Sequence, residues 1–243
     1  MKSASQDILS ERREIWTSKP IIQKLYSRWY GHIKKSLRPG RTLELGGGSG
    51  NLSDFLPEAI TSDIVYEPWL DAVMDAHAIP LKEESLDNIV LFDVLHHLAA
   101  PVVFFHEVER VLRVEGRAIM MEPYVSWLSF PVYRFLHAEG MKWDADPFRD
   151  QTSERKGPFA GNQAIPTLIF QKKREKFLEA FPRLKIIHEQ AMDVFLYPLS
   201  GGFHQPSLCP LFLWGFLERL ERLLNPLGSV LAFRLFIVLE KRG

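Results

Sequence analysis

Short apolar runs alternate with helical stretches from residue 41 to residue 122, and this alternation restricts the fold more than any other feature of the chain. Five runs have the length of strands: TLEL, AITSDIV, AVM, LDNIVLFDVL and RAIMMEPY. Nearly continuous apolar runs suit strands that are buried on both faces. Strands joined by crossover helices form a parallel sheet with helices on its faces. We therefore expect an α/β domain.

Three helical segments are expected around these strands. The first is amphipathic, covers residues 15–37 and stops before a Pro-Gly pair. The second is SGNLSDFL, within the glycine-rich segment that follows TLEL. The third is PVVFFHEVERVLRVEG, which opens with Pro101 and is expected to end at Arg113 and Gly116.

The pattern becomes less regular after Tyr124. Aromatic side chains are scattered among turn residues over residues 125–170, which predicts an insertion or lid after the fifth strand. Packing within the lid is favoured over substrate contact for these aromatics. Beyond the lid we expect a helix (KKREKFLEAF), a strand (LKIIHEQAMDVF), a loop (PLSGGFHQPSLCP), an amphipathic helix (LFLWGFLERLERLL) and a last strand (LAFRLFIVLEKR).

The composition excludes several kinds of partner and site. Lysine and arginine total 30, as do aspartate and glutamate, so the formal net charge is zero and a nucleic-acid surface is not expected. Cys209 is the single cysteine, which excludes an intramolecular disulfide and a cysteine-cluster metal site. A length of 243 residues suits one domain. The first residues, MKSASQDILSERREIW, lack the apolar core of a signal peptide, so we expect a cytoplasmic protein.

The C-terminal part of the chain is rich in apolar residues. Glu218, Glu221 and Arg234 interrupt it, so no integral membrane segment is expected. The predicted helix from Leu211 to Leu224 has a broad Leu/Phe/Trp face, which suits either core packing or a lipid surface. Core packing is favoured because the opposite face is lightly charged and carries no lysine. Peripheral membrane association stays open.

A cluster of four glycines in RTLELGGGSGNLSDFL follows the first strand. Bare backbone at such a junction permits close approach of a ligand with polar or negative groups. A P-loop is excluded, because no lysine lies between Arg41 and Asp63. The dinucleotide fingerprint is excluded too, because no frame places glycines at its first, third and sixth positions. For the loop taken alone, a tight turn without a ligand remains an alternative.

The pattern Glu44-x-Gly46-x-Gly48-x-Gly50 resembles the class I S-adenosylmethionine-dependent methyltransferases, especially the type 11 group. The resemblance extends from Thr42 to Tyr124. It implies a Rossmann-like, doubly wound, seven-stranded sheet that is mostly parallel with an antiparallel last strand. The implied organisation is a single methyltransferase domain over residues 1–243, with an N-terminal helical cap (residues 1–40) and a lid or substrate insertion (residues 125–170).

The resemblance also implies which residues hold the cofactor, S-adenosyl-L-methionine. The glycine loop would wrap its methionine part, Glu44 would support the loop or meet the amino group through water, and Asp63 would accept hydrogen bonds from the ribose hydroxyls. The segment between Asp63 and Asp75 is too short for the helix that the family places there, so Tyr66 or Trp69 is an alternative to Ile64 beside the adenine. The full implied set is Glu44, Gly46, Gly47, Gly48, Asp63, Ile64, Asp75, Ala76, Phe92, Val94 and His97.

Methyl transfer from a sulfonium is an in-line displacement in which orientation alone is worth roughly 7–11 kcal/mol. A general base adds only about 10²–10⁴-fold. Ligands bind beyond the carboxyl ends of parallel strands, which selects His204, His97 and Tyr124, in that order, as the candidate base or orienting groups. Asp93 and His97 are four residues apart, but a metal site is not expected, because a strand and turn are predicted there and no third ligand is apparent.

The acceptor is the least defined part of this interpretation. The overall layout is similar to bacterial methyltransferases of surface-polysaccharide or glycolipid assembly, which implies an oxygen of a sugar or lipid-linked glycan. A small aromatic metabolite fits as well. Two other functions stay open: a non-catalytic partner protein that retains the fold, and a nicotinamide-dependent oxidoreductase, which the glycine spacing disfavours. The sequence predicts no oligomeric state.

Overall fold

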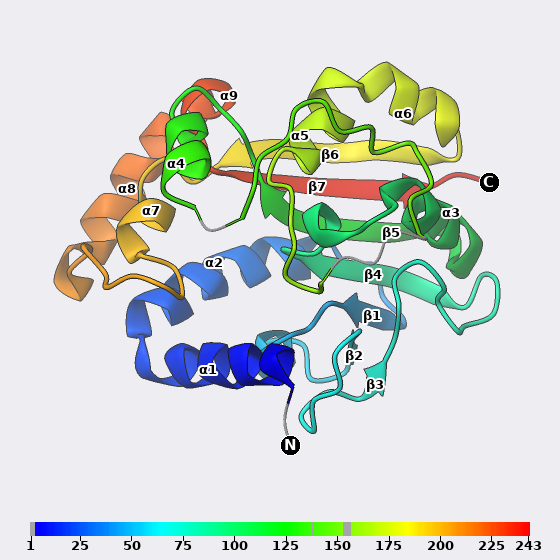
Figure 1. Ribbon diagram of the computed structural model, residues 1–243, viewed down its shortest axis with the longest axis horizontal. Coiled ribbons are helices and arrows are strands. Elements are labelled where there is room, and N and C mark those ends of the chain that lie inside the picture. Colours follow the sequence, from blue (N-terminus) through cyan, green and yellow to red (C-terminus); the bar gives the residue numbers. More distant parts are fainter. Residues whose placement is uncertain (1–2, 138, 153–156) are drawn as a thin grey trace.

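The computed structural model describes residues 3–137, 139–152 and 157–243, and a seven-stranded sheet forms its centre (Figure 1). The strand order is β3-β2-β1-β4-β5-β7-β6. Strands β1 to β5 pair in parallel, whereas β7 is antiparallel to both of its neighbours. The expected sheet is therefore confirmed. The strands are β1 (Thr42–Leu45), β2 (Ile60–Asp63), β3 (Ala72–Val73), β4 (Leu86–Phe92), β5 (Leu112–Pro123), β6 (Leu184–Met192) and β7 (Arg234–Lys241).

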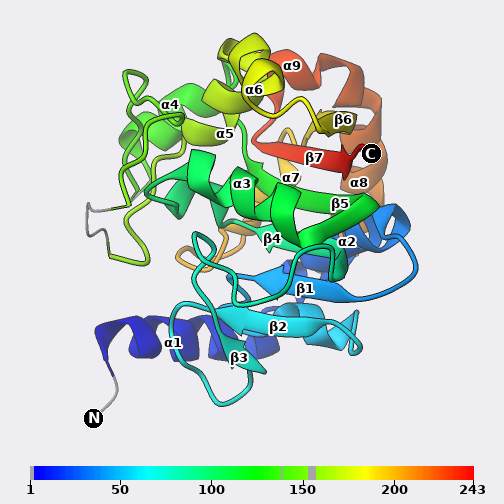
Figure 2. The same ribbon diagram turned by 90° about the vertical axis from the view of Figure 1, so that its right-hand side faces the viewer.

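Helices cover both faces of the sheet (Figure 2). Helices α3 (Pro101–Val111), α5 (Ile165–Thr167) and α6 (Arg174–Ala180) lie on one face. Helices α2 (Pro20–Ser36), α7 (Leu196–Ser200) and α8 (Trp214–Leu224) lie on the other. The remaining helical elements are α1 (Ala4–Ser18), α4 (Ser129–Phe135), α9 (Gly228–Leu231), η1 (Asn51–Asp54), η2 (Leu95–His97), η3 (Leu168–Lys172), η4 (Leu211–Leu213) and η5 (Asn225–Leu227).

Alternation along the central strands creates two hydrophobic cores. On β5, Ala118 and Met120 pack with α3, α5 and α6, whereas Ile119 and Met121 pack with α2 and α7. Successive side chains of a strand point to opposite faces, so a strand that is apolar at every position serves both cores. This explains the nearly continuous apolar runs.

The predicted N-terminal helix is in fact two helices. Lys19 leaves the helical conformation at φ −116° and ψ 87°, and Pro20 starts α2 as its first residue. A proline disfavours helical backbone in the residue before it and lacks the N–H that would continue the helix, so the chain turns there. The expectation of one helix over residues 15–37 was wrong at this point.

Two other predicted helices are shorter than expected. SGNLSDFL forms only the 3₁₀ turn η1, because Gly48 and Gly50 adopt positive φ values of 48° and 75° that interrupt helical backbone. Helix α3 ends at Val111 rather than at Gly116. Leu112 is already extended and pairs with Leu86 of β4, so this segment joins β5.

Core packing was the wrong expectation for most of α8. Of its side chains only Trp214 and Glu221 are buried, and Phe216, Leu220 and Leu223 are exposed. Among the described residues, no helix is both long and apolar enough to cross a membrane.

Candidate active site

A cavity of about 1060 Å³ opens at the carboxyl edge of the parallel strands. The glycine loop follows β1, Asp63 ends β2, and Asp93 follows β4 at this edge. Because β7 runs in the opposite direction, its first residue, Arg234, reaches the same edge. Small-molecule sites in proteins enclose about 300–1,000 Å³, so the cavity is large enough for two ligands side by side.

The glycine loop requires its glycines. Gly46 has a φ of 74°, and a Cβ at this position would overlap the side chain of Val94. Gly48 has a φ of 48°, a conformation that side-chain-bearing residues rarely adopt. The loop is held from β2, because Gly47 N–H donates to the Ser62 carbonyl at 2.8 Å.

Asp63 links the glycine loop to the end of β2. Its Oδ2 accepts from Gly48 N–H and its Oδ1 from Val65 N–H, both at 2.9 Å. The carboxylate also lines the cavity, and a carboxylate has about four acceptor sites, more than these two hydrogen bonds occupy. Burial raises the pKa of Asp63, and these backbone hydrogen bonds oppose the rise.

Glu44 is a buried carboxyl group in the cavity wall. It is 2% exposed, and its Oε2 has no hydrogen-bond partner among the described residues. Burial, together with the negative charge of Asp63, raises the pKa of Glu44 to about 8. An acceptor left without a donor inside a protein costs free energy. The wall therefore favours a cationic or donor group of a ligand at this point.

The N-terminal helix α1 lies over the glycine loop. Arg13 donates through Nη1 to the Ser49 carbonyl at 2.7 Å, and its guanidinium lies 4.8 Å from the ring centre of Trp69. The Trp69 indole N–H in turn donates to the Gly48 carbonyl at 2.9 Å. Arg12, one residue earlier, lines the cavity, with its guanidinium 5.1 Å from the Phe159 ring centre. Sequence reasoning missed both arginines, because only their place on a covering helix distinguishes them from ordinary surface arginines.

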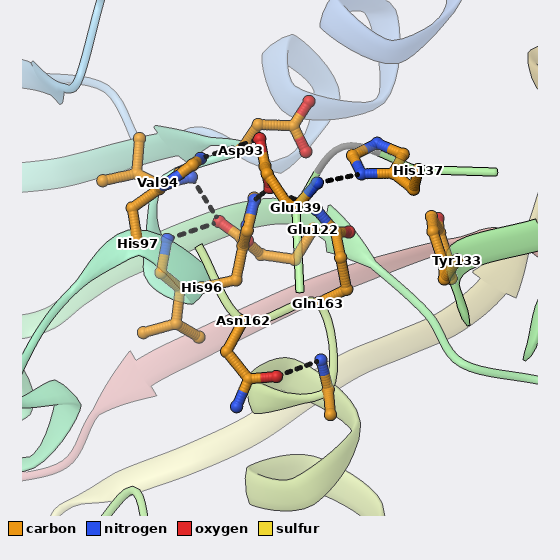
Figure 3. Close-up of polar contacts among 12 residues, drawn as sticks. Asp93, Val94, His96, His97, Glu122, Tyr133, His137, Glu139, Asn162 and Gln163 are labelled. Carbon is orange, nitrogen blue, oxygen red and sulfur yellow. Dashed lines mark hydrogen bonds and ion pairs between the residues drawn. The ribbon is translucent and has the colours of Figure 1, made fainter. Parts of the chain in front are cut away.

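A second cluster of titratable groups lies on the other side of the cavity (Figure 3). His96 Nδ1 is 2.7 Å from Glu122 Oε2, and its Nε2 is 3.1 Å from Glu139 Oε2. Glu122 Oε1 also accepts from the backbone N–H groups of Val94 and Leu95. His96 therefore ties the end of β5 to the insertion that carries Glu139.

Charges within this cluster shift its pKa values in opposite directions. Burial alone would lower the pKa of His96, but the hydrogen bonds and charges of Glu122 and Glu139 raise it to about 9. Burial likewise opposes ionisation of Glu139, but the bond to His96 and the positive charge of His96 hold its pKa at about 2. Burial and the charge of His96 lower the pKa of His97 to about 4. At neutral pH, His96 is thus charged and His97 is neutral.

Comparison with known proteins gives a family and a fold. Residues 43–120 match the family model described as "Methyltransferase domain". No curated protein sequence matches the chain. Among solved structures, an S-adenosylmethionine-dependent methyltransferase from Archaeoglobus fulgidus superposes with a TM-score of 0.50 at 12% identity, covering 90% of this chain and 94% of that one. The PH0226 protein from Pyrococcus horikoshii gives 0.50 at 15% identity, with coverages of 91% and 89%.

Over residues 43–120 the chain therefore carries a methyltransferase domain, which supports the resemblance to the class I S-adenosylmethionine-dependent methyltransferases. Its cofactor is S-adenosylmethionine. The [4+2]-cyclase SpnF superposes equally well, with a TM-score of 0.50 at 13% identity over 88% of this chain and 80% of that one. The fold alone therefore does not determine the reaction, and the acceptor has to be inferred from the cavity.

The methyltransferase cavity contains nearly all of the residues predicted from the sequence. Ile64, the first choice for the adenine wall, lines the cavity and is 55% exposed. Its alternatives, Tyr66 and Trp69, do not line the cavity. The predicted residues that line the cavity are Glu44, Gly46, Gly47, Gly48, Asp63, Ile64, Asp75, Ala76, Phe92, Val94, His97 and His204.

Tyr124, the third catalytic candidate predicted from the sequence, lies outside the cavity. Its hydroxyl donates to the Ser229 carbonyl at 3.1 Å. Burial raises the pKa of this phenol further. Because the Tyr124 hydroxyl is hydrogen-bonded to α9 outside the cavity, it does not face a methyl acceptor bound there. We therefore assign Tyr124 to packing.

The cavity is also lined by an ion pair between the buried Arg234 and the partly exposed Asp93, which sequence reasoning missed. Arg234 Nη1 lies 2.7 Å from Asp93 Oδ1, and the guanidinium lies 5.0 Å and 5.3 Å from the ring centres of Trp29 and Tyr197. Burial would lower the pKa of Arg234, but the charge of Asp93 raises it. Asp93 has a positive φ of 57°, an uncommon conformation for a residue with a side chain. The one sequence signal was an arginine at the start of a very apolar strand.

Two groups of side chains come close enough to share a metal ion, within 4.8 Å: His96, His97 and Glu139, and Asp93, His96 and Glu122. Both groups depend on His96. Since both of its ring nitrogens already bond to carboxylates, we interpret the cluster as an ion-pair network.

Proposed function

We propose that this protein transfers the methyl group of S-adenosylmethionine to an oxygen atom of an acceptor bound in the same cavity. The observation that carries the proposal is the wall formed by Glu44, Asp63 and the glycine loop. It combines an unpartnered buried carboxyl oxygen, a second carboxylate that lines the cavity and bare backbone. These are the partners that an ammonium group, a ribose and a methionine chain require.

In this proposal the cofactor's amino group faces Glu44 and its ribose faces Asp63. Gly46, Gly47 and Gly48 lie against the methionine part. The positively charged sulfur supplies an activated methyl group once the cofactor is bound. The protein's contribution is then to hold the acceptor in line and to exclude water.

Further residues would enclose the adenine and the reacting end. Ile64 and Phe92 offer apolar surface, and Asp75 and Ala76 follow β3 at the adenine edge. The Asp75 carboxylate accepts from His77, which holds it in place. Val94 and His97 would line the end at which the methyl group meets the acceptor.

A base, where the acceptor requires one, would be a histidine. His204 is an exposed side chain at the cavity rim, and His97 is half-buried and neutral at pH 7. The His97 Nδ1 is buried without a hydrogen-bond partner among the described residues. We keep His204 as the first candidate and His97 as the second. His97 also suits the role of orienting the acceptor.

The cap and the lid complete the proposal. Residues 1–40 would act as the cap over the cofactor, of which residues 1 and 2 lie outside the described part. Residues 125–170 would act as the lid, of which residues 138 and 153–156 lie outside it. We also propose a cytoplasmic location, where the cofactor is available, and an acceptor that is a small molecule, a sugar or a lipid-linked glycan.

Titration calorimetry with S-adenosylhomocysteine and with NADH tests the cofactor assignment. We expect binding of the first and no heat with the second. Asp63→Ala removes acceptors for hydrogen bonds worth about 1.5–3 kcal/mol each, so affinity should fall at least tenfold. Asp63→Asn, which keeps the shape of the side chain, serves as the folding control. Absence of heat with either compound would favour a non-catalytic partner protein, and binding of NADH alone would favour an oxidoreductase.

A further inference from the structure

Helix α8 has apolar side chains on both of its faces. The inner face carries Trp214 and Glu221, both buried. The Glu221 carboxylate accepts from the backbone N–H groups of Val194 and Leu196, so it holds the start of α7. The buried face of α8 thus contains the polar side chain of Glu221, whereas the apolar side chains of Phe216, Leu220 and Leu223 are exposed.

Exposed apolar side chains at the same end of the molecule as α8 also lie on other elements. The apolar patch is defined by side chains at this end that are each more than 60% exposed: Trp127, Phe135, Leu136, Phe212, Phe216 and Leu223. They belong to α4 and its flanks, to η4 and to α8. Figure 1 shows α4, α8 and α9 at the same end of the molecule, and Figure 2 shows that α4 and α8 lie apart from each other at that end. Leu128 N–H donates to the Val230 carbonyl at 3.2 Å, which joins α9 to the segment before α4.

The extent of the apolar patch is unusual for a surface. Phe212 is 85% exposed and Trp127 is 84% exposed. Proteins commonly expose single apolar side chains, so several large ones exposed to this degree at one end of the molecule indicate an interaction site.

The charged groups around the apolar patch indicate the kind of partner. On α8, Glu218 pairs with Arg222 at 3.3 Å and is thereby neutralised. Arg134 on α4 and Arg219 on α8 have no acidic partner within 4.0 Å in the described ranges. Free cations beside exposed Trp, Phe and Leu side chains complement the phosphate groups and acyl chains of a lipid surface.

The apolar patch continues into the rim of the cavity. Leu136 is part of the patch and lines the cavity. Leu208, on the loop after α7, is 74% exposed and also lines the cavity. The rim of the active-site cavity therefore reaches the patch at Leu136.

We propose that the apolar patch docks on a lipid bilayer. The side chains of the patch insert among the acyl chains, and Arg134 and Arg219 contact lipid phosphate groups. The patch consists of protruding side chains from separate short elements, a shape that enters a fluid layer readily. A protein partner would have to provide a matching concave surface.

The position of the cavity mouth extends the proposal to the acceptor. Docking through the patch brings the mouth, between Leu136 and Leu208, to the bilayer surface. A lipid-borne acceptor reaches the cavity from this side, while the cofactor wall lies at the opposite end near β1 and β2. This second step rests on the proposed methyltransferase function, whereas docking itself does not.

Flotation with vesicles tests docking directly. Phosphatidylcholine vesicles, with and without phosphatidylglycerol, are mixed with the wild-type protein and with two double variants. We expect the wild type to float with both kinds of vesicle. Phe212→Ser with Phe216→Ser should weaken binding at least tenfold, because two exposed aromatic side chains no longer leave water. Val114→Ser with Leu178→Ser removes exposed apolar side chains outside the patch and should bind like the wild type.

Cofactor binding serves as the independent control. Both double variants should bind S-adenosylhomocysteine with wild-type affinity, which shows that they are folded. A third double variant, Arg134→Gln with Arg219→Gln, should weaken binding to phosphatidylglycerol vesicles more than to pure phosphatidylcholine.

Three results would overturn docking: a wild-type protein that stays in solution, an aromatic double variant that floats like the wild type, or a dimer that the aromatic variant abolishes without any vesicle binding. A wild-type protein that binds vesicles but does not bind S-adenosylhomocysteine would instead refute the proposed function without refuting docking.

Discussion

At the scale of single residues, Glu44 has the most informative environment in the cavity. Its carboxyl group is buried, has one oxygen without a partner and has a pKa raised to about 8. The family resemblance identified the residue, but its ionisation depends on burial and on Asp63, and neither could be known before the chain is folded. A carboxyl group in this state makes ligand binding sensitive to pH.

We predict that affinity for S-adenosylhomocysteine rises with pH, by roughly tenfold per unit between pH 6 and pH 7.5. Below pH 8 the empty site is mostly protonated at Glu44, and binding of an ammonium group requires the ionised form. Titration calorimetry at several pH values measures this slope. Glu44→Gln should bind at least tenfold more weakly at pH 8 and show a much smaller slope; an equal slope in the variant would refute the role of Glu44.

His204 and His97 lead to a second prediction. His204→Ala should leave the affinity for S-adenosylhomocysteine unchanged and lower turnover about 10²-fold or more, since a lost general base costs about 10²–10⁴-fold. Production of S-adenosylhomocysteine with the true acceptor measures turnover. His188→Ala, a strand residue outside the cavity, is the matched control. If turnover were unchanged in His204→Ala, His204 would not be the general base and His97 would become the first candidate.

At the scale of elements, the cavity is built where α1, the glycine loop and the insertion meet. The strands were predictable, because each is a local apolar run. The cover was not, because Arg13 meets Ser49 and His96 meets Glu139 across long stretches of chain. Periodicity describes which face of an element is buried, but it contains no information on which distant polar groups will pair.

Because α1 contacts the glycine loop through Arg13, we predict that removing this contact weakens cofactor binding. Arg13→Ala removes a hydrogen bond to the Ser49 carbonyl and the contact with Trp69. We expect about fivefold to tenfold weaker binding of S-adenosylhomocysteine and a loss of about 1 kcal/mol in the free energy of unfolding. Glu11→Ala, on the exposed side of the same helix, should change neither quantity. If Arg13→Ala and Glu11→Ala bound S-adenosylhomocysteine equally well, the contact of α1 with the glycine loop would not contribute to cofactor binding.

The bridge from His96 to Glu139 predicts a pH-dependent stability. The folded pKa of His96, about 9, lies above the ordinary value, so its contribution is complete below about pH 6.5 and is lost as pH rises through 9. Glu139 has a folded pKa of about 2, so its contribution is lost as pH falls from about 4.5 through 2.

Glu139→Gln should therefore lower the free energy of unfolding by about 1–3 kcal/mol at pH 6, and the difference from the wild type should shrink between pH 7 and pH 9.5. Chemical denaturation at each pH measures it. Glu115→Gln, which removes an exposed ion pair between β5 and Arg38, is the control. A difference that stays constant over this range would show that His96 is not charged in the folded protein.

At the scale of the whole molecule, cofactor and acceptor sites differ in how far the sequence reveals them. The cofactor wall comes from one contiguous region with a recognisable spacing, and every predicted residue in it lines the cavity. The proposed acceptor side is assembled from the insertion, the loop after α7 and the start of β7, which all line the cavity. The outward apolar face of α8 was equally hidden, because an amphipathic pattern does not state which of its faces meets the core.

Transfer of a labelled methyl group to compounds in cell extracts would establish the reaction. The protein is incubated with S-adenosylmethionine labelled in its methyl group and with separate lipid and aqueous extracts of its source cells. We predict that label is transferred to a compound of the lipid extract, that transfer depends on the protein, and that Asp63→Ala abolishes it. Binding of S-adenosylhomocysteine without transfer of label to any compound in either extract would contradict the claim that this fold carries out methylation.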